Sequence, residues 1–210
     1  MGVGEVSIML IGERDMTEDI RAGDVQQWIE LLHSRVPTER LTGATELASL
    51  AVRTWTRGGI RTRGTISQAA PSRLPEGVSL SAAVEAFHDQ HVEVRRAVAF
   101  ALGEWADETA VHVLRQSAAA DAESAVRGEA IDALGKIGGQ QAVAVLKRAA
   151  RYDRSVDVRI RAVRALADLA NAERSASQGV VEALEHVKQE DPAAPVKRQA
   201  DAALARLGRT

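Results

Sequence analysis

Apolar residues recur along the C-terminal part of the chain at a spacing that fits repeated helices. Leu102, Leu134 and Leu166 follow one another at intervals of 32 residues, and Leu204 comes 38 residues later. An alanine precedes each leucine, and further apolar residues lie three or four positions away, which is the spacing of one helical face. A period of this length indicates an array of small units that bury their apolar faces only by stacking on each other.

Each unit is predicted to contain two helices joined by a turn that begins with an aspartate. These aspartates are Asp89, Asp121, Asp153 and Asp191, and a basic residue follows each after six positions: Arg95, Arg127, Arg159 and Lys197. Helical periodicity places the first helices of the units at residues 81–88, 109–118, 140–150 and 177–188. We interpret the charged series as structural: the aspartate caps the second helix, and the arginine pairs with the aspartate of a neighbouring unit.

A divergent first unit is predicted over residues 24–52. Asp24 is the expected N-cap of its first helix, and Pro37 suits the first turn of its second helix. Arg40 takes the place that Arg95 has in the next unit, which aligns Leu47 with Leu102. The sequence therefore predicts an all-α superhelix over residues 23–210, a solenoid of about five helix pairs.

Two segments fall outside this pattern. Residues 1–22 show no helical period and are predicted to be a flexible N-terminal lead-in. Residues 53–78 are predicted to be an inserted loop, because arginines alternate there with glycine, serine, threonine and proline. Repeat arrays accept such insertions in the turns between helices.

The aspartate turn followed by Val-Arg, Ala and Ala-Leu-Gly resembles the HEAT-like repeats of the phycobilisome-lyase type. The likeness is good over residues 79–210 and weak over residues 24–52. It implies antiparallel helix pairs stacked into a right-handed superhelix, with the second helices lining the concave face.

The concave face is the expected binding surface. It should carry the residues one, two, five and nine positions after the basic residue of each second helix. Both signs of charge and an exposed aromatic residue occur there, which favours a protein or peptide ligand over a row of phosphates. The candidate protein-binding residues are Arg96, Phe100, Glu129, Asp132, Arg161, Arg164 and Arg198. Arg161 and Arg164 vary between units, whereas Arg159 recurs, so specificity is expected at the two variable arginines.

Composition narrows the range of partners. The formal net charge is -2, which provides no general attraction to nucleic acid or to an anionic membrane. No stretch approaches the ~18 apolar residues that a membrane span needs, so we expect a cytoplasmic protein without a membrane partner. The inserted segment is the one local signature of a polyanion partner, and it keeps nucleic-acid binding open as an alternative. Its candidate polyanion-binding residues are Arg57, Arg61, Arg63 and Arg73.

Residues that carry chemistry are scarce. The chain has no cysteine, which excludes thiolate catalysis and cysteine-ligated zinc, and it has no phosphate-binding loop or nucleophile elbow. His88 and His91 are close in sequence, but no third ligand follows, and the His-Glu pairs of HEAT-like iron hydroxylases do not occur.

We therefore expect no catalytic residue, no metal and no cofactor. The expected function is that of a non-catalytic scaffold that holds a protein or peptide on its concave face. A role as a chromophore-lyase-like enzyme, or as a subunit of one, is a further alternative that the resemblance implies.

Overall fold

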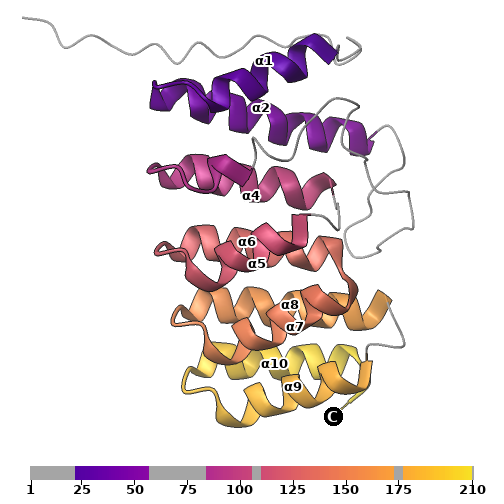
Figure 1. Cartoon of the computed structure of the whole chain (residues 1–210). Coiled ribbons are helices and arrows are strands. Elements are labelled where there is room, and N and C mark those ends of the chain that lie inside the picture. The colour runs from indigo at the N-terminus through magenta and orange to yellow at the C-terminus, as the bar shows by residue number, and fades with distance from the viewer. Residues whose placement is uncertain (1–21, 57–83, 106–109, 173–176, 210) are drawn as a thin grey trace, which may run out of the picture.

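A computed structural model describes residues 22–56, 84–105, 110–172 and 177–209. Within these ranges the regular elements are α-helices, and they stack in chain order from α1 and α2 at one end to α9 and α10 at the other (Figure 1). The predicted all-α solenoid is confirmed. No described helix is both long enough and apolar enough to cross a membrane.

The helices form pairs that match the predicted units. They are α1 (Ala22–Leu32), α2 (Pro37–Thr56), α4 (Val92–Trp105), α5 (Val111–Ala120), α6 (Ser124–Ile137), α7 (Gly139–Tyr152), α8 (Val156–Ala172), α9 (Ser177–Glu190) and α10 (Ala194–Arg206). The first helices expected at 109–118, 140–150 and 177–188 correspond to α5, α7 and α9. Residues 84–86 are helical as well, at the place of the first helix expected over 81–88.

The N-terminal unit differs from the prediction at two boundaries. Asp24 is not an N-cap, because α1 already begins at Ala22 and includes it. Pro37 is the first residue of α2, as expected, but this helix continues to Thr56. No glycine or proline lies between Gly43 and Gly58, so residues 53–56 continue the helix. The remainder of the expected loop at 53–78, and the lead-in up to residue 21, lie outside the described residues.

The recurring leucines form the core between the units. Leu102, Leu134, Leu166 and Leu204 are between 0% and 3% exposed, and they belong to one continuous apolar cluster. Each lies on a second helix, where the face made by every third or fourth residue points into the stack. Burial of one such side chain contributes about 1.5–3 kcal/mol. The leucine series therefore fixes the register of the array.

The second helices pack directly on one another, in the series α2, α4, α6, α8 and α10. Small residues allow this close approach. A Cβ atom added to Gly103 would lie 2.6 Å from the Cβ of Ala133, and one added to Gly135 would lie 2.8 Å from the Cβ of Ala165. The recurring glycine and alanine are thus explained by backbone contact between successive units, which makes the second helices a continuous layer.

Arginine and aspartate side chains join each unit to the next. The Arg159 guanidinium donates from Nε to Asp191 Oδ2 at 2.6 Å and from Nη2 to Asp191 Oδ1 at 3.1 Å. Its third nitrogen, Nη1, donates to the carbonyl oxygen of Asp153 in its own turn at 2.8 Å. Equivalent contacts link Arg127 to Asp153 and Arg95 to Asp121. This confirms the expected pairing between neighbouring units, and we call the series the Asp–Arg ladder.

Each ladder aspartate also orders its own turn. Asp121 Oδ1 accepts the backbone N–H of Glu123 at 2.9 Å. Glu123 is itself the N-cap of α6, so the aspartate stands two residues before the cap and does not occupy it. Burial alone would raise the pKa of the Asp121 carboxyl, but the hydrogen bonds from Arg95 and from the Glu123 amide outweigh it and lower that pKa. The carboxylate therefore stays charged where it serves both contacts.

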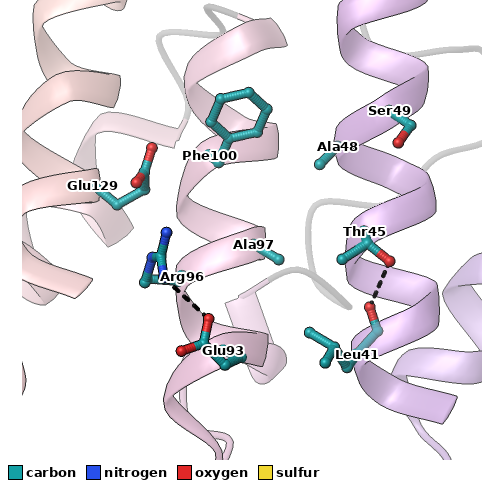
Figure 2. Close-up of a pocket in the computed structure, with 9 residues that line it drawn as sticks. All are labelled: Leu41, Thr45, Ala48, Ser49, Glu93, Arg96, Ala97, Phe100 and Glu129. Atoms are coloured by element: carbon teal, nitrogen blue, oxygen red, sulfur yellow. Dashed lines mark hydrogen bonds and ion pairs between the residues drawn. The ribbon is translucent and has the colours of Figure 1, made fainter. Parts of the chain in front are cut away.

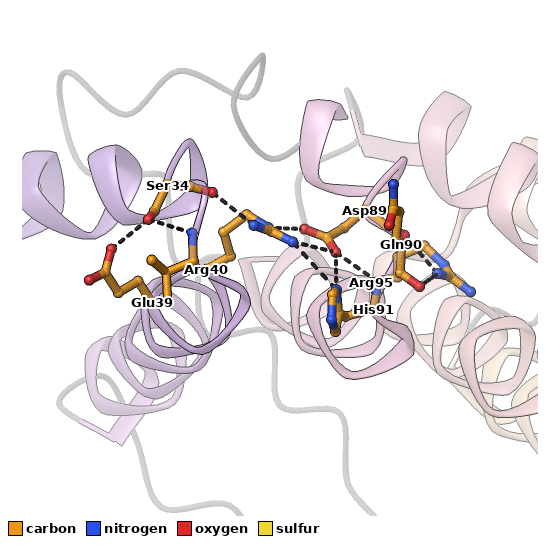
Figure 3. Close-up of polar contacts among 8 residues, drawn as sticks. Ser34, Glu39, Arg40, Asp89, Gln90, His91 and Arg95 are labelled. Carbon is orange, nitrogen blue, oxygen red and sulfur yellow. Dashed lines mark hydrogen bonds and ion pairs between the residues drawn. The ribbon is translucent and has the colours of Figure 1, made fainter.

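The ladder changes at its two outer positions. In the first unit Ser34 takes the aspartate's place: its Oγ accepts the Val36 N–H at 3.0 Å, and its carbonyl oxygen accepts Arg40 Nη1 at 2.8 Å (Figure 3). Arg40 reaches across to Asp89, which also accepts the backbone N–H of His91 at 2.7 Å. In the last unit Lys197 replaces the arginine, and its Nζ donates to the Gln189 carbonyl oxygen at 2.7 Å.

Candidate functional site

An open groove of about 540 Å³ lies on the layer of second helices, at its N-terminal end. Its floor is largely apolar and is formed where α2 and α4 meet (Figure 2). The groove is lined by Leu41, Thr45, Ala48, Ser49, Glu93, Arg96, Ala97, Phe100 and Glu129. Glu129 comes from α6 and lies on the other side of α4 from the α2 residues (Figure 2). The groove thus combines an apolar floor with charged side chains at one edge, and we call it the N-terminal groove.

Short side chains on α2 keep this groove open. Five and nine positions after its basic residue, the first unit has Thr45 and Ser49. The second unit has the larger side chains of Phe100 and Glu104 at the same two positions. The α2 side of the groove was not predicted from the sequence, although the small residues at these two positions of the first unit indicate it.

Phe100 provides the apolar wall of the groove. The sequence predicts an exposed ring, but the residue is partly buried and packs against the core. Lys136 Nζ lies 4.7 Å from the ring centroid, and the same ammonium pairs with Glu104. The contact with the Lys136 ammonium holds the Phe100 ring in place. The ring is therefore a preformed contact surface beside the groove.

Most charges on this face are already paired between units. Arg161 Nη1 lies 2.5 Å from Asp132 Oδ2, and its Nε lies 3.0 Å from Asp157 Oδ2. Arg206 Nη2 lies 2.9 Å from Asp168 Oδ1. The contacts with Asp132 and Asp168 join the third unit to the fourth and the fourth to the fifth, whereas Asp157 lies on the same helix as Arg161. Asp132 and Arg161, two of the predicted binding residues, therefore bind each other.

Glu129 is the exception among these carboxylates. It is half-buried, and within the described part of the chain no cation lies within ion-pair distance of it. Burial, and then the charge of Asp132, raise the pKa of the Glu129 carboxyl more than the charges of Lys136, Arg161 and Arg96 lower it. A carboxylate in this position is an unmatched acceptor at the edge of the groove.

Of the other predicted binding residues, one lies at the groove and two lie apart from it. Arg96 is at its edge, where Nη1 lies 3.1 Å from Glu93 Oε2. Arg164 and Arg198 are exposed on α8 and α10 and have no ion pair with another described residue. The predicted binding residues therefore fall into three groups. Arg96, Phe100 and Glu129 line the groove, and Asp132 and Arg161 pair with each other. Arg164 and Arg198 have no ion pair with a described residue.

The histidine pair is part of the ladder turn. His91 Nδ1 lies 3.2 Å from Asp89 Oδ1, and Arg40 lies on the other side of the same carboxylate (Figure 3). His88 is exposed in the same turn. No group of three or more histidine, aspartate or glutamate residues suited to a metal ion is found in the described ranges.

The predicted polyanion-binding arginines lie outside the described residues, so this hypothesis remains a prediction. If it is right, DNA binding should weaken steeply as salt rises from about 50 to about 200 mM. It should also weaken when the four arginines are changed to serine: Arg57, Arg61, Arg63 and Arg73. A salt-titrated fluorescence assay measures both effects. The matched control changes four exposed arginines elsewhere to serine: Arg35, Arg115, Arg148 and Arg151. Equal binding by the two variants would contradict the hypothesis.

Comparison with known proteins agrees with the geometry. The family model for HEAT repeats matches residues 80–167. A search of curated proteins finds no match. Among solved structures, the complex of CpcE and CpcF of phycocyanin lyase from Nostoc sp. PCC7120 is similar, with a TM-score of 0.59 and 19% identity over 87% of this chain and 99% of that chain.

Two further structures share the architecture. A designed armadillo repeat protein in complex with the peptide (KR)4 has a TM-score of 0.59 and 21% identity, over 88% of this chain and 82% of that chain. Human deoxyhypusine hydroxylase has a TM-score of 0.52 and 19% identity, over 90% of this chain and 75% of that chain. Likeness at these identities concerns the fold. Together with the family match over residues 80–167 and the Asp–Arg ladder, it shows that the chain has a HEAT-like repeat fold.

Proposed function

We propose that this chain is a non-catalytic scaffold that holds a protein or peptide against its layer of second helices. The observation that carries the proposal is the N-terminal groove, an open, largely apolar surface with Phe100 as its wall. Apolar grooves rimmed by polar groups mark places where a partner's side chains are buried. The two free arginines, Arg164 and Arg198, extend the same surface toward the C-terminal end.

The similar structures support a binding role in general terms. The designed armadillo repeat protein is described in complex with a peptide, and the CpcE and CpcF proteins in complex with each other. Stacked helices present a long surface on which an extended chain makes many contacts. A lyase-like activity is supported only by the shared fold, which does not determine function.

The test uses a library of random octapeptides displayed on phage and selected on the purified protein. Enriched peptides are then measured by fluorescence anisotropy against a face variant that combines Phe100→Ala, Arg164→Glu and Arg198→Glu. Affinity should fall at least about ten-fold, because an aromatic anchor and two cations are lost.

The matched control carries the same chemical changes on the first helices: Tyr152→Ala, Arg115→Glu and Arg148→Glu. All three residues are exposed there, and the change in net charge is identical. The control should bind like the parent, and both variants should melt like it. No enrichment on the parent, or equal loss in the two variants, would contradict the proposal.

A further inference from the structure

The N-terminal groove has a composition that specifies what it binds. We propose that it takes an extended peptide in which an apolar side chain lies two positions from a lysine or arginine: the apolar side chain enters between Leu41 and Phe100, and the cation pairs with Glu129. This inference rests on the proposed function and names the partner's chemistry.

The unmatched charge of Glu129 is the first part of the argument. Three other carboxylates on this layer, Glu104, Asp132 and Asp168, each pair with a base from the following unit. Glu129 has no such pair with any residue that the structure describes, although it is half-buried and burial of an unpaired charge is costly.

The cations near Glu129 are engaged elsewhere. Arg96 pairs with Glu93 at 3.1 Å, Lys136 with Glu104, and Arg161 with both Asp132 and Asp157. A cation supplied by a ligand would complete the row of pairs without breaking one. An anionic ligand would instead place two like charges together at the groove edge.

The position of the apolar floor relative to Glu129 specifies an extended peptide. Leu41 lies on α2, Phe100 on α4 and Glu129 on α6, so a ligand that reaches all three crosses the helices (Figure 2). Packed helices lie about 8–10 Å apart. Alternate side chains of an extended peptide point to the same face and are separated by about 6.6 Å, and the length of a lysine or arginine side chain covers the remainder. The apolar and the basic residue therefore occupy positions i and i+2, in either direction.

The same octapeptide selection tests this inference separately from the proposed function. On the parent protein, peptides with a leucine, isoleucine, valine or phenylalanine two positions from a lysine or arginine should be enriched about ten-fold over peptides with glutamine in the basic position. That ratio is the scale of one charge-assisted hydrogen bond. Enrichment of peptides without this pattern would overturn the inference and leave the proposed function intact.

Two single substitutions test the basic and the apolar position of the peptide separately. Glu129→Gln keeps the shape of the edge and should remove the preference for lysine and arginine, while the apolar preference stays. Thr45→Trp adds a large ring from an exposed position on α2 and should remove the apolar preference by filling the groove. Both variants should melt like the parent. A basic preference that survives in Glu129→Gln, or an apolar preference that survives in Thr45→Trp, would overturn the assignment.

Other occupants of the groove would give different results in sedimentation and in the peptide selection. The parent should sediment as the same species as Thr45→Trp; self-association that this substitution abolishes would assign the groove to a second copy of the chain. Changing Arg57, Arg61, Arg63 and Arg73 to serine should leave the peptide pattern unchanged. A pattern that appears only after those changes would mean that the chain's own basic segment is the occupant, and the proposal would fail.

Discussion

Replacing Leu166 with aspartate should abolish the cooperative thermal unfolding of the array. Leu166 is 0% exposed at the centre of α8, between the neighbouring units. The substitution removes about 1.5–3 kcal/mol of apolar burial and places a carboxylate in the apolar core, which costs several kcal/mol more. The sum is comparable to the whole stability of an ordinary domain, about 5–15 kcal/mol.

Circular dichroism during heating measures this effect, and a second aspartate provides its control. Arg164→Asp introduces the same side chain two residues earlier in α8, at an exposed position with no ion pair to another described residue. It should change the melting temperature by only a few degrees, since substitutions at such sites cost about 0.5 kcal/mol or less. A Leu166→Asp protein that melts like the parent would show that the proposed helix register is wrong.

Arg159→Ala should destabilise the protein by about 3–5 kcal/mol, which is the usual cost of removing one partner from a buried ion pair. Arg159 is 7% exposed and Asp191 is 6% exposed, so the carboxylate left behind has little access to water. The substitution also leaves the Asp153 carbonyl oxygen without its guanidinium donor. Denaturant unfolding followed by circular dichroism gives the free-energy difference.

The outer charge pairs provide the comparison for this measurement. Arg206→Ala removes the contact with Asp168, in which both side chains are about half exposed. Exposed pairs of this kind contribute about 0–1 kcal/mol. If Arg159→Ala costs no more than Arg206→Ala, the Asp–Arg ladder does not stabilise the stacking of the units.

The architecture was predictable because the residues that build it recur. Leu134 and Leu166 meet the same surroundings in successive units, and so do Arg127 and Arg159, so one interpretation explains every copy. Asp24 was misassigned since it belongs to the divergent first unit, where no second copy corrects the start of the helix.

The candidate site was less predictable, because it depends on differences between units. Asp132 and Arg161 look like two free charges in the sequence, and only the stacking of α6 on α8 brings them together. The groove arises from what Thr45 and Ser49 do not fill, which appears only when α2 is placed against α4. Glu129 was predicted as a binding residue, but its lack of an ion pair among the described residues follows from the pairing of the cations around it.

The two outer positions of the ladder make the units unequal as building blocks. An internal unit such as the one with Asp121 and Arg127 has both halves of the joint, an acceptor for the unit before it and a donor for the unit after it. The first unit offers Ser34, which has no carboxylate, and the last offers Lys197, which has no planar fork of donors. The joint between the internal units is thus one repeated fitting, whereas each of the outer two units has only one half of it.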